Sequence, residues 1–139
     1  MYRHILVAIE NSDADRAVIQ HIEQLARLTG AHLLLVHVAD GWAARHFEDL
    51  KLRESEEIRD DKAYLTKLCD ELTSRGLETR ARLAMGDPAT ELVKVAVEEG
   101  VDLIAMSTHG HRFLNDLLHG STADRVRHNV TMPVLMVRK

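Results

Sequence analysis

The chain has 139 residues and a net charge of −4, with 45% hydrophobic and 29% charged residues. These values are typical of one soluble globular domain, here residues 1–139, and the acidic balance argues against a nucleic-acid partner. No apolar run is long enough to cross a membrane, so no membrane partner is expected either. The only cysteine, Cys69, cannot form an internal disulfide, which is typical of a reducing compartment. We therefore expect a cytoplasmic protein.

Five short segments have the composition of β-strands. Four are continuous apolar runs, which are typical of strands buried on both faces of a sheet. The fifth alternates apolar with charged residues, which predicts one solvent-exposed face and a position at a sheet edge. In chain order the predicted strands are 4–9, 32–38, 77–85 (the alternating one), 102–107 and 133–137.

Helical patterns lie between these strands. The first helix is predicted over 12–29, where the hydroxyl of Ser12 can cap it with Asp15 three residues later. The second covers about 46–75 and carries an apolar stripe along one side. Its first half, 48–62, is mostly charged, and we interpret that run as a solvent-exposed helix face.

The two later helices have clear boundary signals. Asp87 can cap the third helix, Pro88 suits its first turn, and Gly100 follows its end. The fourth is predicted from about Ser121 to 128–129. Strands and helices thus alternate along the chain, which predicts an α/β fold with a doubly wound, five-stranded, mainly parallel sheet and four helices.

The strand order expected for this sheet is 3-2-1-4-5, with the alternating strand at one edge. In such sheets a ligand binds where the strand order reverses, beyond the carboxyl ends of the first and fourth strands. Those ends are "AIENS" (8–12) and "MSTHG" (106–110). We therefore expect the ligand site beside these two segments.

Two glycines, Gly110 and Gly120, flank the apolar stretch 113–118 after the fourth strand. Gly110 can turn the chain tightly and expose backbone N–H groups. Gly120 precedes the predicted helix start, where Ser121 and Thr122 offer hydroxyls beside the free N–H groups of the first turn. Residues 107–128 also carry four histidines and more arginines (Arg112, Arg125, Arg127) than acids (Asp116, Asp124). This combination predicts an anion site. The alternative is that both glycines only end or begin helices and bind no ligand.

The segment resembles the nucleotide-binding signature of the universal stress protein family, G-x2-G-x9-G-[ST], which reads Ser107-x2-Gly110-x9-Gly120-Ser121 here. The resemblance covers the whole chain, because "ILVAIENS", "HLLLVHVAD", "GDPATELV", "VDLIAMSTHG" and "MPVLMVRK" match in order. It implies an adenine nucleotide alpha-hydrolase-like fold in a cytoplasmic, usually dimeric domain that binds ATP. ADP or AMP could replace ATP as the ligand, and Mg²⁺ would be held mainly by the nucleotide phosphates.

The resemblance also assigns individual contacts. Adenine and ribose are expected at the end of the first strand, against Ala8, Ile9 and Glu10, with a backbone group of Val38 also holding adenine. The loop after the fourth strand is expected around ribose and phosphates, at Met106, Ser107, His109, Gly110, His111, Arg112 and Phe113. Arg112 is the expected mobile phosphate contact. Phosphate oxygens are also expected at Gly120, Ser121 and Thr122.

Two residues depart from the family pattern. Ser107 stands at the first glycine of the signature, where its Cβ narrows the approach of the backbone to a ligand, although serine is small. Glu10 stands where the family usually has aspartate, and its carboxylate is still an acceptor for ribose hydroxyls. Neither change removes the predicted phosphate pocket.

Other kinds of site have less support. The single cysteine and scattered histidines do not supply the four ligands of a structural zinc site, so no metal site from the protein alone is expected. His37, inside an apolar strand, is expected to be a hydrogen-bonded core residue. No catalytic residue is assigned, because the sequence does not show that Ser121 or Thr122 has an oriented base beside it.

The leading hypothesis is a nucleotide-dependent stress-response signalling module, whose ATP occupancy alters the binding of a downstream protein or the geometry of a homodimer. The final strand would form the dimer interface, because it is an apolar edge without charge or internal proline: Val134, Leu135, Met136 and Val137. Two alternatives stay open, a dimeric interaction module that binds no nucleotide and a slow ATPase or autophosphorylating protein. A receiver domain would need a phospho-accepting aspartate and a lysine that are missing here, and 4% aromatic residues leave little to stack on a flavin.

Overall fold

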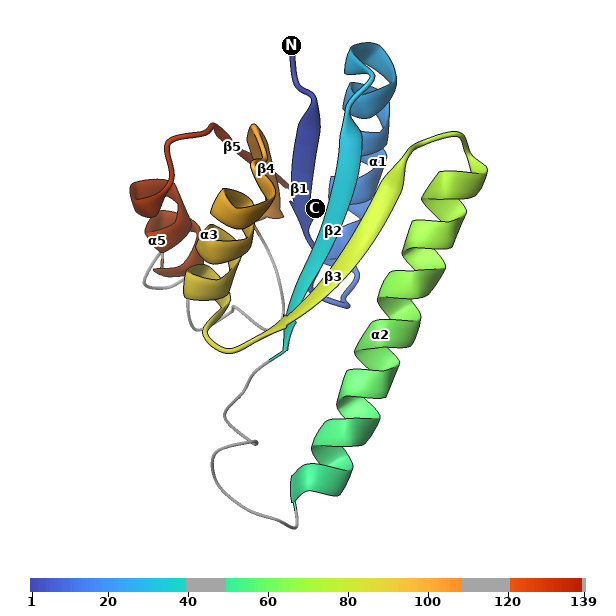
Figure 1. Cartoon of the computed structure of the whole chain (residues 1–139), viewed down its shortest axis with the longest axis vertical. Coiled ribbons are helices and arrows are strands. Elements are labelled where there is room, and N and C mark those ends of the chain that lie inside the picture. The colour runs from blue at the N-terminus through green and yellow to red at the C-terminus, as the bar shows by residue number, and fades with distance from the viewer. Residues whose placement is uncertain (40–49, 109–120, 139) are drawn as a thin grey trace.

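Five parallel strands form one sheet in the order β3-β2-β1-β4-β5 in a computed structural model of the chain (Figure 1). The structure describes residues 1–39, 50–108 and 121–138, with the backbone alone for 50–55 and 121. The predicted strand order is confirmed, and every strand pair is parallel. The strands are β1 (His4–Ala8), β2 (His32–Ala39), β3 (Thr79–Met85), β4 (Leu103–Ser107) and β5 (Val134–Val137).

Four helices lie in the described residues, and they cover both faces of the sheet (Figure 1). They are α1 (Ala14–Thr29), α2 (Leu50–Ser74), α3 (Pro88–Glu99) and α5 (Ser121–Asn129). The predicted cap of α3 is confirmed, because Asp87 accepts a hydrogen bond from the Thr90 N–H at 3.0 Å. Gly100 ends this helix in the left-handed conformation, with φ 64°, where a side chain would be strained.

The first helix begins at Ala14, two residues after the predicted start at Ser12. The predicted capping pair takes a different form. Ser12 Oγ accepts only a 3.3 Å bond from the Ala14 N–H, whereas the Asp15 carboxylate turns back over the preceding loop and accepts from its N–H groups. The carboxylate of Asp15 therefore holds the loop that leads into the helix.

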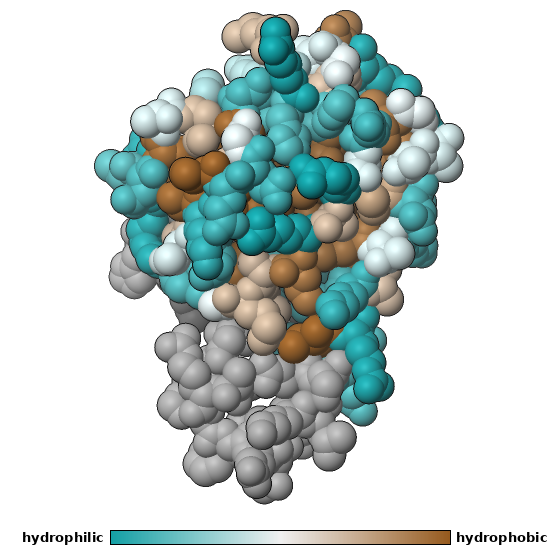
Figure 2. Space-filling model, viewed as in Figure 1, coloured by the Kyte–Doolittle hydropathy of each residue, from teal (hydrophilic) through white to brown (hydrophobic). Residues whose placement is uncertain are grey.

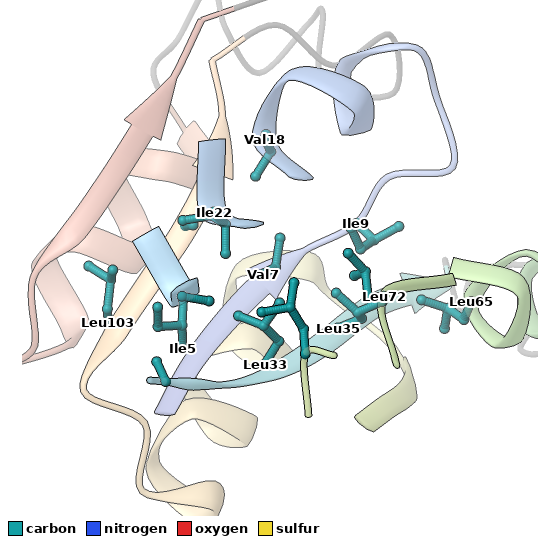
Figure 3. Close-up of a cluster of buried hydrophobic side chains, with 14 residues drawn as sticks. Ile5, Val7, Ile9, Val18, Ile22, Leu33, Leu35, Leu65, Leu72 and Leu103 are labelled. Carbon is teal, nitrogen blue, oxygen red and sulfur yellow. The ribbon is translucent and has the colours of Figure 1, made fainter. Parts of the chain in front are cut away.

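Two apolar layers hold the helices against the sheet, because successive residues of a strand point to opposite faces. On one face Ile5, Val7 and Leu35 pack against α1 and α2 (Figure 3). On the other face Leu6 and Val36 pack against α3 and α5. The central strands are thus buried on both sides, as their continuous apolar runs predict.

The alternating strand is confirmed as an edge, β3. Its two arginines lie along α3, where Arg80 pairs with Glu99 at 2.9 Å and Arg82 pairs with Glu98 at 2.8 Å. The apolar side of β3 is expected to be buried, but it is buried only in part, since Met85 is 44% exposed. At an edge the last residue of a strand has no neighbour beyond it to cover its side chain.

Hydrophilic residues cover most of the described surface on the face seen in Figure 2, and hydrophobic residues lie in small groups between them. A search of the described helices found none with the length and apolar character needed to span a bilayer.

Candidate functional site

Three neighbouring strands bring the predicted site residues to the end of the sheet at which the strands terminate; this carboxyl end is the edge meant below. In the parallel registers, Ala8 lies beside Val36 of β2, and Val7 lies beside Ala105 of β4. The carboxyl ends of β1, β2 and β4 therefore meet, and the chain order reverses between β1 and β4. This is the position at which doubly wound sheets bind ligands.

The described site residues are mostly buried at this edge. Ala8, Ile9, Glu10 and Met106 are buried, and Val38 and Ser107 are partly buried. The backbone of the strand-one residues is already well ordered by the sheet, because the Ile9 N–H donates to the Val36 carbonyl at 2.8 Å.

The helix α5 belongs to the same core as the ends of β1 and β4. Thr122 is buried there, and Val126, one turn later, belongs to the apolar cluster that contains Ala8 and Met106. The structure thus packs α5, through Val126, in the same apolar cluster as residues at the ends of β1 and β4, which are distant in the sequence. The N-terminus of a helix presents free N–H groups and a partial positive charge, both of which favour an anion.

Part of the predicted site lies outside the described residues. This part comprises the apolar segment 113–118 and the predicted contacts at His109, Gly110, His111, Arg112, Phe113 and Gly120. Ser121 is the first residue of α5, as predicted, and its side chain is likewise outside the described part.

An ion pair ties α5 to the start of α3. Two Arg125 nitrogens donate to the two carboxylate oxygens of Asp87, at 3.1 and 2.7 Å. This arginine, chiefly, holds the pKa of Asp87 well below its usual range, although partial burial opposes the shift. The contact joins the middle of α5 to the loop between β3 and α3.

The arginine excess predicted around the site is weaker than the sequence indicates. Arg125 is bound to Asp87, and Arg127 pairs with Asp124, three residues earlier on the same helix, at 2.9 Å. Both charges are therefore balanced by carboxylates. Of the three arginines, only Arg112 is still expected to contact phosphate, and it lies outside the described residues.

The loop after β1 is held by a buried carboxylate. Asp15 accepts from the N–H groups of Glu10 and Asn11 at 2.8 Å each and of Ser12 at 3.2 Å. Tyr64 of α2 donates its hydroxyl to the same carboxylate at 2.8 Å. Burial, first, and this hydrogen bond, second, raise the pKa of Tyr64.

His37 is confirmed as a hydrogen-bonded core residue. It is 2% exposed, its Nδ1 lies 2.7 Å from the Ile9 carbonyl oxygen, and its Nε2 lies 3.1 Å from Oδ2 of Asp61. The other oxygen of Asp61 accepts from the Asn11 side chain at 3.0 Å.

The interpretation of 48–62 as a solvent-exposed face is wrong at Asp61, which is 1% exposed. A signal for this was present in the sequence. Asp61 precedes the buried Leu65 by four residues, so it lies on the same stripe of the helix as the apolar residues. Its partners, by contrast, could not be read from local spacing.

The described part of the edge offers backbone groups, hydroxyls and one carboxylate, a set suited to binding a neutral base, ribose hydroxyls and an anion. Within residues 1–39, 50–108 and 121–138, no three His, Cys, Asp or Glu side chains are grouped to hold a metal ion. Glu10 is inside the loop, with its Oε2 3.2 Å from Ser12 Oγ.

Comparison with known proteins gives the following similarities. The model of the universal stress protein family matches residues 1–138. A universal stress protein of Methanocaldococcus jannaschii is 28% identical, with 100% of this chain and 96% of the relative covered, and its solved structure gives a TM-score of 0.88. Universal stress protein A homolog 1 of Coxiella burnetii is 32% identical, with 98% and 96% covered. The structure of a universal stress protein from Archaeoglobus fulgidus in complex with dAMP gives a TM-score of 0.72 at 25% identity and covers 98% of both chains.

Proposed function

The chain belongs to the universal stress protein family, and from that premise we propose that it is an adenine-nucleotide-binding module with ATP as its ligand. The observation that supports the proposal is that the carboxyl ends of β1 and β4 lie side by side where the strand order reverses, with Val126 of α5 in the same apolar cluster as Ala8 and Met106. The similarity to a relative solved with dAMP supports an adenine nucleotide as the ligand class.

In this proposal, different residues at this end of the sheet bind the adenine, the ribose and the phosphates. Ile9 and a backbone group of Val38 hold adenine, and Glu10 accepts from ribose hydroxyls. The phosphates lie against the start of α5, at Ser121 and Thr122, where helix N–H groups and hydroxyls can donate to their oxygens. Mg²⁺ accompanies the phosphates without a protein site of its own.

Calorimetric titration with ATP, ADP and AMP tests the binding. We expect ATP to bind the wild type, and Gly110→Val and Gly120→Val to abolish the heat while the melting temperature stays close to that of the wild type. Leu28→Val is the matched control, since Leu28 is 85% exposed near the far end of α1. Absence of heat with the wild type freed of any co-purified nucleotide would instead favour an interaction module that binds no nucleotide.

The nucleotide is proposed to act as a signal. Its occupancy would alter the binding of a downstream protein or the geometry of a homodimer joined through β5. Mass spectrometry of the purified protein is a direct check, because a tightly bound nucleotide should co-purify. Steady phosphate release that is lost in Ser121→Ala, with binding retained, would reveal a slow ATPase.

A further inference from the structure

Three ionisable side chains, from α1, β2 and α2, are buried around the loop after β1. Asp15 and Asp61 are each 1% exposed, and His37 is 2% exposed. Removing an ion from water costs several kcal/mol unless partners compensate for the lost hydration. Burial of these ionisable side chains calls for an explanation other than packing, because apolar residues of similar size would fill the same space.

The first element of the group is one clamped peptide unit, Ile9–Glu10. Its carbonyl oxygen, from Ile9, lies 2.7 Å from His37 Nδ1. Its N–H, from Glu10, donates to Asp15 Oδ1 at 2.8 Å. Side chains from β2 and α1 therefore hold the two ends of a single peptide plane, which cannot rotate without breaking both bonds.

The second element is the buried contact between His37 and Asp61. A carbonyl oxygen only accepts hydrogen bonds, so Nδ1 of His37 must carry the proton directed at Ile9. The opposite nitrogen, Nε2, lies 3.1 Å from Oδ2 of Asp61. At this distance the two side chains form a buried ion pair when the imidazole is protonated. Asp61 thus keeps the imidazole ring oriented toward Ile9.

The third element is the unusual backbone of Asn11. Its φ is 61°, in the left-handed region that asparagine tolerates better than most residues. Its side chain donates to Asp61 Oδ1 at 3.0 Å, and its N–H donates to Asp15 Oδ2 at 2.8 Å. Asp61 therefore holds both the ring that supports Ile9 and the residue that turns the chain after Glu10.

We propose that Asp61 and His37 are positioning residues for the nucleotide: from α2 and β2 they fix the Ile9–Glu10 peptide and the turn at Asn11, on which the adenine and ribose contacts depend. The inference rests on the proposed function. Neither side chain has to touch the nucleotide, because both act by fixing the shape of the loop that contacts it.

Three variants of α2 test the proposal. Asp61→Ala removes the contacts to His37 and Asn11 and should weaken ATP affinity about tenfold, a difference that calorimetry resolves well. Asp61→Asn should restore it, because the amide can donate to a neutral His37 at Nε2 while its oxygen accepts from Asn11. Leu65→Ala is the matched control. It removes buried packing one turn later and should lower the melting temperature without changing the affinity of the folded protein.

The loop itself gives a second readout that stability alone would not move. In the ligand-free protein, the amides of Glu10, Asn11 and Ser12 should exchange hydrogen faster in Asp61→Ala than in Leu65→Ala, and at the wild-type rate in Asp61→Asn. If Asp61→Ala does not fold, Asn11→Gly replaces it. Glycine allows the φ of 61° but cannot bond to Asp61, so affinity should again fall.

The outcomes separate the inference from the proposed function. Wild-type affinity in Asp61→Ala, or in Asn11→Gly where that variant replaces it, overturns the inference and leaves nucleotide binding intact. An equal loss of affinity in Leu65→Ala also overturns it, since general loosening of α2 would then be the cause. A wild type that binds no adenine nucleotide overturns the proposed function, and the positioning role with it.

Discussion

Tyr64 shows how one residue links the stability of the protein to the loop at its candidate site. The ring is partly buried between α1 and α2, and its hydroxyl proton points at a carboxylate that already receives three backbone N–H groups. Ionisation would place two negative charges at 2.8 Å. For this reason, together with burial, the pKa of Tyr64 is raised.

Tyr64→Phe should therefore lower the free energy of unfolding by about 1.5–3 kcal/mol at neutral pH, the usual contribution of a hydrogen bond to a charged group. Because the pKa is higher in the folded state, this contribution is complete below the ordinary tyrosine pKa of about 10 and is lost as the pH rises beyond it. Urea unfolding of both proteins at neutral and alkaline pH checks this. A difference in unfolding free energy between the two proteins that grows with rising pH would contradict this role of the Tyr64 hydroxyl.

The contact between α3 and α5 works at the scale of whole elements. Asp87 ends the loop after β3, caps α3 through Thr90 and receives two bonds from Arg125 of α5. One carboxylate thus caps α3 and holds α5 at Arg125, the fifth of its nine residues. Since α5 begins beside the predicted phosphate site, its placement matters for function as well as for stability.

Asp87→Ala should lower the free energy of unfolding by about 1–2 kcal/mol, from the lost cap and a mostly exposed ion pair. Arg125→Gln keeps the cap and should cost less. The pKa of Asp87 is lowered in the folded state, so its contribution is present above the ordinary pKa of about 3.9 and is lost as the pH falls below that value. Denaturant midpoints at neutral and acidic pH measure both effects. Equal losses in the two variants would mean that the cap contributes nothing.

At the scale of the whole molecule, the two edges of the sheet differ. The β3 edge carries Arg80 and Arg82, both paired with acids of α3. The β5 edge is the uncharged run Val134–Val137, without the charges that usually protect an edge from pairing with another chain. This contrast supports a homodimer formed by two copies of β5.

Met136→Lys should convert the proposed dimer to a monomer at micromolar concentration, since it places a charge where the second copy would pack. Met85→Lys is the matched control, because Met85 is a similarly exposed methionine on the opposite edge, 44% against 37% exposed. Sedimentation velocity distinguishes the two. A monomeric wild type, or dissociation by both variants, would refute an interface at β5.

Much of the fold could be predicted because its signals are local. The apolar run of β1, the alternation of β3 and the cap at Asp87 each involve a few consecutive residues, and together they indicate the order 3-2-1-4-5. The candidate site could be predicted in outline for the same reason, since strand ends and helix starts are visible in the sequence. The contacts within it could not.

By itself, the sequence predicted the α/β class and the strand order, which the structure confirms, because hydrophobic periodicity and caps act over short distances along the chain. Only the tertiary structure decided that Asp61 is buried against His37 and that Arg125 belongs to Asp87. Asn11 and Asp61 are 50 positions apart and Arg125 and Asp87 are 38 apart. Which charge meets which, and whether water is excluded between them, depends on how the helices pack and not on the residues beside them.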